Sequence, residues 1–177
     1  MLVNIGFDNI SNHVIPMDQF YLKWRFTERK YKLLPYTHLN QLKPLDKSAS
    51  AFLWGYISLT DVHANVPFKR NLYKEVNQIL RTSRNEREIK KWLFNCGFSF
   101  SKEVYLSWNP ESAMIVPWKL LIKYFDDFAY LGSDDLTVID ASLNWALLFF
   151  HEGMIYFGAN VDKLAMLTEQ DEKGTSS

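Results

Sequence analysis

The chain contains one cysteine, Cys96, and no long uninterrupted apolar run within its 177 residues. A single cysteine excludes an internal disulfide and is typical of a protein in a reducing compartment. No apolar run reaches the roughly 18 residues that a membrane-spanning helix needs, and residues 1–13 lack the basic start and apolar core of a secretory signal. We therefore expect a cytoplasmic protein without a membrane segment, in which Cys96 is a small core residue.

The sequence also lacks the short motifs that mark common catalytic and metal sites. It has no phosphate-binding glycine loop, no G-x-S-x-G turn and no H-E-x-x-H motif. His13, His38, His63 and Cys96 are too scattered to form a zinc motif. We expect no cofactor and no metal, and an enzyme only if folding assembles a site from residues that are distant in the sequence.

Aromatic side chains, by contrast, are abundant. Hydrophobic residues make up 47% of the chain and aromatic residues 16%, with six Trp and thirteen Phe. This composition argues against disorder, and the length suits one well-packed domain better than two. We expect a single domain over residues 1–168, followed by a polar and disordered tail, residues 169–177.

The formal net charge is zero, but the charges are unevenly distributed. Residues 65–102 carry nine Lys and Arg against three Asp and Glu, whereas residues 103–177 carry four against twelve. A surface with charges of one sign attracts partners of the opposite sign. The sequence therefore predicts a basic side and an acidic side.

Apolar residues recur at helical spacing through much of the first half of the chain. An N-cap candidate at Asp46 or Ser48 and a C-cap candidate at Gly97 mark two helix ends. The third helix, opened by Pro67, would be amphipathic with a basic outer face. The expected helices cover residues 19–26, 46–58, 67–80 and 86–96.

In the second half the apolar residues follow a strand period. Alternation predicts strands at 103–108 and 113–116 around a turn, a helix at 118–128, and three consecutive strands at 136–140, 144–151 and 154–158. Glu152-Gly153 would be a two-residue hairpin turn. Because strand 144–151 is apolar on both faces, we expect it to lie in the centre of the sheet, with other parts of the chain packed against each of its two faces. We expect an α+β fold: a mostly helical first half, then a mainly antiparallel sheet of about five strands with helices against one face.

Three carboxylate-containing pairs could carry chemistry. His151-Glu152 could act as a base or bind metal, but neighbours on a strand point to opposite faces, so we favour a role in ending the strand. Asp126-Asp127 and Asp134-Asp135 resemble paired metal ligands, yet no third ligand sits at a recognisable spacing. The alternative is that the first pair ends a helix and the second begins a strand.

The same carboxylates predict a binding site for a partner. Asp126, Asp127, Asp134 and Asp135 flank a short connection that contains Tyr130, which we expect to be exposed. Loops beside a rigid sheet often carry binding residues, and tyrosine is a common interface anchor. The alternative is that the carboxylates merely cap the helix and keep the turn in water.

The basic stretch of residues 66–92 allows a different function. Its cations are interleaved with Tyr73 and Trp92, as in some nucleic-acid-binding surfaces. Glu75, Glu86 and Glu88 dilute the positive charge, so a solvated helical face is the interpretation that we favour. Nucleic-acid binding stays open as an alternative function.

Residues 134–158 resemble the closing segment of small bacterial immunity proteins of contact-dependent inhibition and related polymorphic toxin systems. The shared elements are Asp134-Asp135, Trp145, His151-Glu152 and Gly158. Residues 15–18, 23–26 and 41–44 resemble the opening of an uncharacterised bacterial domain family, which implies no activity. The immunity resemblance implies a protein that neutralises the C-terminal toxin domain of a cognate protein, often a nuclease, by tight non-catalytic association. An uncharacterised hydrolase is the third hypothesis.

Overall fold

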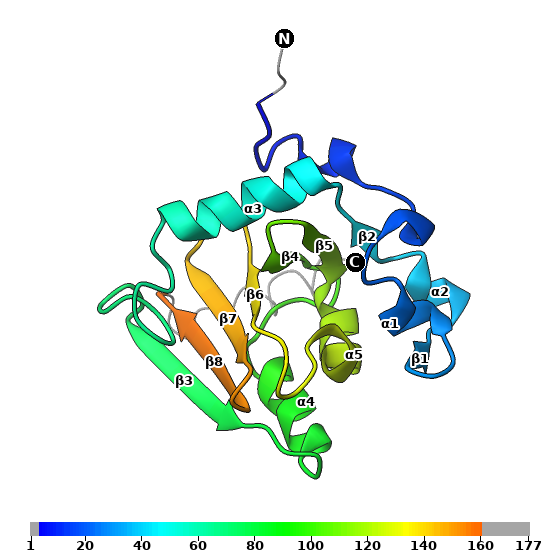
Figure 1. Cartoon of the computed structure of the whole chain (residues 1–177). Helices are drawn as coiled ribbons and strands as arrows, with labels where there is room; N and C mark the ends of the chain where they lie inside the picture. The colour runs from blue at the N-terminus through cyan, green and yellow to red at the C-terminus, as the bar shows by residue number, and fades with distance from the viewer. Residues whose placement is uncertain (1–3, 161–177) are drawn as a thin grey trace, which may run out of the picture.

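The computed structural model describes residues 4–160, and a seven-stranded antiparallel sheet is its central element (Figure 1). The predicted α+β class is confirmed. The strand order is β2-β5-β4-β6-β7-β8-β3. The strands are β2 (Lys43–Pro44), β3 (Glu75–Leu80), β4 (Glu103–Asn109), β5 (Ser112–Pro117), β6 (Leu136–Ile139), β7 (Trp145–Phe150) and β8 (Met154–Ala159). The expected tail, residues 169–177, lies outside the described residues, as does the end of the expected domain.

Short helical segments and three longer helices surround this sheet. The helix predicted over residues 19–26 is reduced to one turn, α1, while the predictions at 46–58, 86–96 and 118–128 are confirmed as α3, α4 and α5. A two-residue strand, β1 (Lys32–Leu33), pairs locally with the end of α1. The helices are η1 (Ile10–His13), η2 (Met17–Gln19), α1 (Trp24–Thr27), α2 (Tyr36–Leu39), α3 (Lys47–Leu59), α4 (Glu86–Phe94) and α5 (Trp118–Phe128).

The three consecutive strands predicted near the end of the chain are present as β6, β7 and β8. β7 lies between the other two and is buried over almost its whole length, because both of its faces are apolar. The predicted two-residue hairpin is wrong. Phe150 pairs with Met154, so residues 151–153 form the connection and Gly153 has a φ of +88°. His151, which the sequence predicts as the last residue of strand 144–151, therefore lies in the turn and is exposed.

The helix predicted over residues 67–80 is wrong. Residues 68–74 form turns after a cis peptide bond at Pro67, and β3 then pairs with β8 along its whole length. Ile79 packs against the core, whereas Val76 and Leu80 are 50% and 57% exposed. Val76, Ile79 and Leu80 have the spacing of an amphipathic helix, but the segment forms a strand because its backbone pairs with β8. Together with β2 this raises the strand number to seven, and the first half is less helical than expected.

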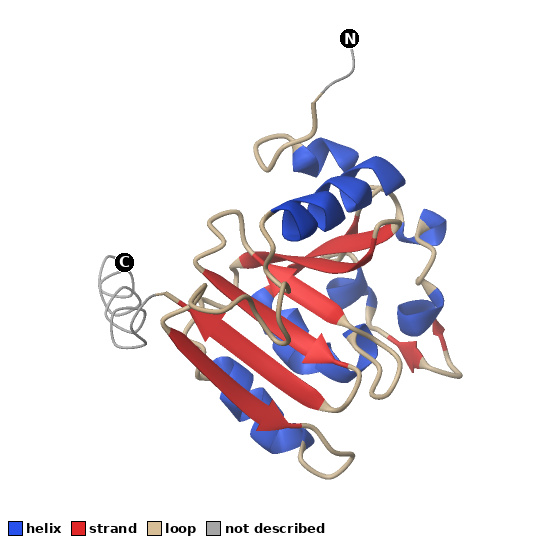
Figure 2. Cartoon of the chain, turned by 60° about the vertical axis from the view of Figure 1, so that its left-hand side comes forward, coloured by secondary structure: helices blue, strands red, loops and turns tan. Residues whose placement is uncertain are grey.

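Helices cover both faces of the sheet, so the prediction of helices against one face is also wrong. α4 and α5 pack on the face that carries Leu106, Leu147 and Phe157. α3 crosses the opposite face over β4 and β5, where Ala49 and Leu53 are fully buried (Figure 2). We refer to this opposite face, which carries Thr137, Leu148 and Tyr156, as the α3 face.

Beyond α3, the α3 face is covered by the loop that leads to β3. Val62, Phe68 and Tyr73 from this loop are buried against it. The ring of Tyr73 lies so close to Gly158 that a Cβ at this position would come within 2.3 Å of a ring carbon. The close approach of the Tyr73 ring therefore explains why a glycine occupies position 158.

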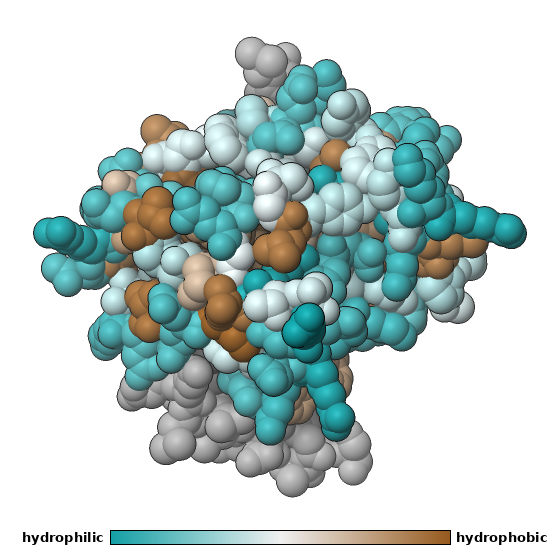
Figure 3. All heavy atoms as spheres, turned by 60° about the horizontal axis from the view of Figure 1, so that its bottom comes forward, coloured by the Kyte–Doolittle hydropathy of each residue, from teal (hydrophilic) through white to brown (hydrophobic). Residues whose placement is uncertain are grey.

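Figure 3 views the end of the molecule that lies lowest in Figure 1. Hydrophobic side chains there form small groups separated by hydrophilic ones. The described residues also include no helix with the length and hydrophobicity that crossing a bilayer requires. A mainly apolar cleft lies on the α3 face.

Candidate functional site

The structure divides the predicted acidic loop into buried and exposed carboxylates. Asp134 forms a two-point ion pair with Arg25, with N–O distances of 2.6 and 3.1 Å, and the two side chains are only 13% and 7% exposed. Asp134 also accepts a hydrogen bond from the backbone N–H of Tyr130 at 2.7 Å. Arg25 donates to the carbonyl of Phe128 at 3.1 Å. Arg25 thus connects α1 to the end of α5 through the Phe128 carbonyl and to the loop before β6 through Asp134, and the two opposite charges compensate each other inside the protein.

Tyr130 is half-buried, which corrects the expectation that it is exposed. The Arg25 guanidinium lies over its ring, 4.3 Å from the centroid, and the ring of Trp24 is 5.9 Å away. Burial raises the pKa of the Tyr130 hydroxyl. The aromatic anchor predicted for a partner is thus already used to cover the Arg25–Asp134 pair.

Asp126 and Asp127 also have neighbours within the fold. Asp126 binds Arg81 at 2.7 Å, and the Arg81 side chain is buried with its guanidinium over the Phe125 ring. Burial raises the pKa of the half-buried Asp127 carboxyl, against the opposing effect of nearby Lys32. Neither residue belongs to a set of three potential metal ligands, since the described part of the chain contains no such set.

Asp135 differs from its neighbour because it is exposed and points to the α3 face. Its carboxylate accepts a hydrogen bond from the backbone N–H of His151 and contacts the Nδ1 atom of that imidazole, both at 2.9 Å. His151 directly follows β7 and Asp135 directly precedes the neighbouring strand β6. The imidazole of His151 therefore contacts the carboxylate of Asp135. Asp135 also lines a cleft on this face, whose lining does not include Asp126, Asp127, Tyr130 or Asp134.

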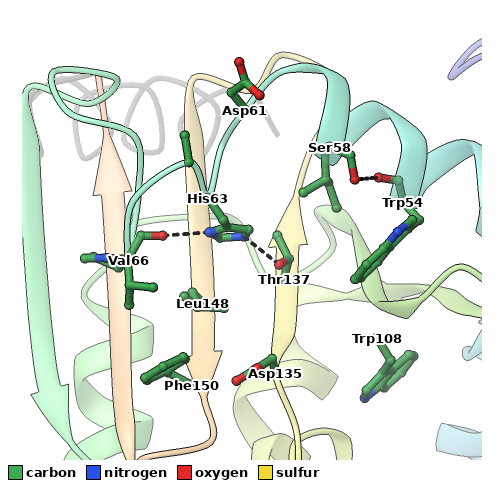
Figure 4. A pocket seen from close by; sticks show the side chains of 13 residues that line it. Trp54, Ser58, Asp61, His63, Val66, Trp108, Asp135, Thr137, Leu148 and Phe150 are labelled. Atoms are coloured by element: carbon green, nitrogen blue, oxygen red, sulfur yellow. Dashed lines mark hydrogen bonds between the residues drawn. The ribbon is translucent and has the colours of Figure 1, made fainter.

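That cavity is a cleft of about 420 Å³ on the α3 face (Figure 4). β6 and β7 form its floor, the C-terminal half of α3 forms one wall and the loop after α3 forms the other. Its lining is mainly apolar, and two of its large hydrophobic side chains are partly exposed: Trp54 is 42% exposed and Val66 is 62% exposed. The lining residues are Trp54, Ile57, Ser58, Asp61, His63, Ala64, Val66, Pro67, Trp108, Asp135, Thr137, Leu148 and Phe150.

His63 lies in the middle of the cleft and ties the loop to the floor. Its Nδ1 atom is 2.7 Å from the Pro67 carbonyl and its Nε2 atom is 2.8 Å from the Thr137 hydroxyl. Because a carbonyl can only accept, Nδ1 donates and Nε2 accepts the Thr137 proton. Burial lowers the pKa of His63, although the Pro67 contact and the charge of Asp135 oppose this. The imidazole is therefore neutral near pH 7.

Two exposed carboxylates, Asp61 and Asp135, stand at the rim of the cleft, and each contacts one exposed side chain. Asp61 is 3.7 Å from Lys69 across exposed side chains, and Asp135 contacts the exposed His151. Exposed pairs of this kind are worth little, and water screens them. The rim of an apolar cleft thus carries carboxylates that are available to a cation on a partner.

The basic stretch does not form the helical face that the nucleic-acid alternative requires. Lys69 lies in a loop beside Asp61, Arg81 is buried against Asp126, and Lys90 on α4 pairs with Glu86 one turn away. These cations belong to a loop, the end of a strand and a helix. The expected helix over residues 67–80, which would have carried several of them on one face, is absent from the structure.

Sequence reasoning missed most of the cleft. No sequence motif marks Trp54 as a binding residue, and His63 is named only among residues that are too scattered for a zinc motif. The contact between His63 and Thr137 joins positions that are 74 residues apart, so no local sequence pattern predicts it. An aromatic residue on the outer side of the predicted helix 46–58 was the one available signal.

Comparisons with known proteins identified no relative of this chain. No family model matches the chain, and no similar protein was found among the curated proteins or the solved structures.

Proposed function

We propose that this protein is an immunity protein, which neutralises a cognate toxin domain by non-catalytic association through the cleft on the α3 face. The immunity role rests on the resemblance of residues 134–158. The observation that supports association is the cleft itself, where the partly exposed Trp54 and Val66 adjoin an apolar floor. Exposed aromatic side chains next to a well-defined pocket are frequent energetic centres of protein interfaces.

The rim of the cleft suggests the chemistry of the partner. Asp61 and Asp135 place carboxylates beside apolar walls, an arrangement that suits the methylene stem and charged head of a lysine or arginine. Toxin domains that act on nucleic acid present such residues on their surface. Rim charges mainly increase the association rate, while the aromatic contact slows dissociation.

Protection of cells tests this proposal. The toxin to use is the C-terminal domain of a large secreted protein encoded directly upstream; metabolic genes in that position would remove most support. Cells that express the toxin domain should survive with the wild-type protein and die with the Trp54→Ala variant. Leu59→Ala is the matched control, because Leu59 is 87% exposed on the same helix and does not line the cleft.

The acidic rim has its own test in binding kinetics. Asp135→Lys should slow association with the toxin domain and reduce the salt dependence of the rate, while Asp18→Lys, an exposed carboxylate elsewhere, should not. Asp134 is unsuitable for this experiment, because its charge is paired with Arg25 and its loss would change folding. An unchanged association rate for Asp135→Lys at low salt would exclude the rim from the interface.

A hydrolase is the second candidate, and one observation favours it. Thr137, His63 and the Pro67 carbonyl follow the order of hydroxyl, imidazole and orienting acceptor that activates a nucleophile. The Thr137 residue, however, is only 7% exposed, which limits the approach of a substrate. Hydrolysis of p-nitrophenyl acetate that is lost in Thr137→Val would support a hydrolase, whereas equal rates in both proteins would dismiss it.

A further inference from the structure

The two edges of the sheet differ in how they are protected. β2 has only two residues, one of them Pro44, whose carbonyl accepts a hydrogen bond from the backbone N–H of Ile15 at 2.9 Å. β3 has six residues, contains no proline and carries the exposed side chains of Val76 and Leu80. Proteins usually shorten, cover or charge such an edge, because its free backbone groups pair with other strands.

The register of β3 shows which of its backbone groups point outward. The N–H of Arg81 donates to the Gly153 carbonyl at 2.7 Å, which makes these two residues a hydrogen-bonded pair. Bonded pairs alternate in an antiparallel ladder, so Glu75, Asn77 and Ile79 point their backbone groups to β8. The residues that point theirs away from the sheet are Val76, Gln78 and Leu80.

One of these outward groups already has a partner. The side-chain amide of Asn85 donates to the Leu80 carbonyl at 2.6 Å. Among residues 4–160, the outward N–H groups of Val76, Gln78 and Leu80 and the carbonyls of Val76 and Gln78 have no hydrogen-bond partner. The edge is therefore largely open to a further strand.

We propose that a second copy of this chain pairs with β3 in an antiparallel arrangement centred on Gln78. In that register Gln78 faces Gln78 of the second copy, and Val76 faces its Leu80 on both sides of the two-fold axis. All three outward-pointing residues then meet one another, and about four backbone hydrogen bonds form without disturbing the Asn85 contact. The edge is thus complementary to itself.

The side chains fit the same register. Val76 and Leu80 lie on the α3 face, so each apolar side chain covers the other across the new pair. Glu75 falls opposite Arg81 of the second copy, and no like charges face each other from Lys74 to Thr82. The pairing extends the sheet through both copies and leaves the two clefts on one side of it, separated from the junction by β8.

Sedimentation of the full chain tests this dimer. The wild-type protein should sediment as a dimer at micromolar concentration. The double variant Val76→Lys with Leu80→Lys places like charges opposite each other and should weaken dimerisation about tenfold or more. Because both side chains are exposed, the variant should keep its circular dichroism spectrum and melting temperature. Leu59→Lys, on the exposed side of α3, should remain dimeric as the control.

A charge swap tests the register. Val76→Lys combined with Leu80→Glu places opposite charges across each pair and should restore the dimer in the proposed arrangement. A wild-type protein that is monomeric at about 100 µM would overturn the proposal, as would a double-lysine variant that dimerises normally. Failure of the swap to restore association would overturn the register centred on Gln78. None of these results depends on the toxin, so they are separable from the proposed function.

Discussion

Replacing Asp134 by Ala should destabilise the protein far more than the same change at Asp135. The Asp134 side chain accepts two hydrogen bonds from Arg25 and one from the backbone of Tyr130, within a largely buried contact. Its removal leaves the Arg25 guanidinium buried without its counter-charge. Asp135 binds only the exposed His151 and the backbone N–H of that residue.

The loss in the free energy of unfolding depends on the group that each substitution leaves without its partner. Breaking a buried ion pair by removing one partner costs about 3–5 kcal/mol in the free energy of unfolding, because the remaining charge stays out of water. Arg25 keeps its bond to the Phe128 carbonyl, which favours the lower part of this range. Removing one partner of an exposed pair costs about 1 kcal/mol or less. We therefore expect about 3 kcal/mol for Asp134→Ala and less than about 1 kcal/mol for Asp135→Ala.

Urea melts of both variants measure the difference. A double-mutant cycle with Arg25→Ala should give a coupling energy of about 2 kcal/mol for Arg25–Asp134, because the second substitution then removes little more. Equal losses at Asp134 and Asp135 would refute this reasoning. A loss below about 1 kcal/mol at Asp134 would show that the ion pair does not hold α1 to the loop between α5 and β6.

Three further changes test the packing and the pH dependence. Trp145→Ala removes a buried indole that packs 4.5 Å from the Phe98 ring and donates to Asp140 at 2.8 Å, so thermal and urea melts should show a loss of about 3–5 kcal/mol. Gly158→Ala should cost about 1–3 kcal/mol in urea melts, because its Cβ has no room. Because burial lowers the pKa of His63 in the folded state, protonation of this imidazole favours the unfolded state. The stabilisation that the neutral His63 provides is therefore complete above pH 6.5, the ordinary pKa of histidine, and is lost as the pH falls through the pKa of the folded state. The stability difference between wild type and His63→Gln should therefore shrink between about pH 7.5 and 5 in melts at each pH, and an unchanged difference would contradict a buried neutral imidazole.

Local patterns predicted the elements whose partners lie nearby in the sequence. β7 and β8 are joined by three residues, so alternation and Gly153 were enough to predict the hairpin, if not its length. β3 has no such partner, because β8 lies about 80 residues later. Val76, Ile79 and Leu80 then read as one side of a helix, since nothing local distinguishes a half-exposed edge strand from an amphipathic helix.

The site was less accessible to sequence reasoning than the fold. Asp134 and Asp135 are the same residue type at adjacent positions, and only the distant Arg25 decides that the first is buried. The cleft is formed by the end of α3, the loop after it and strands β6 and β7, and the contact that joins the loop to the strands, His63 with Thr137, spans 74 residues. Of the five partner-binding residues that the sequence predicts, Asp135 lines the cleft, and whether the acidic loop binds a partner stays a prediction.

The central claim is that the cleft on the α3 face is the binding surface, and the affinity of purified variants for the toxin domain tests it most directly. Isothermal titration calorimetry should show that Trp54→Ala weakens binding about 30-fold, the loss of roughly 2 kcal/mol that is typical of an interface hot spot. Leu59→Ala, on the same helix outside the cleft, should bind within about twofold of wild type. Wild-type affinity in Trp54→Ala, with the fold verified by circular dichroism, would contradict the account.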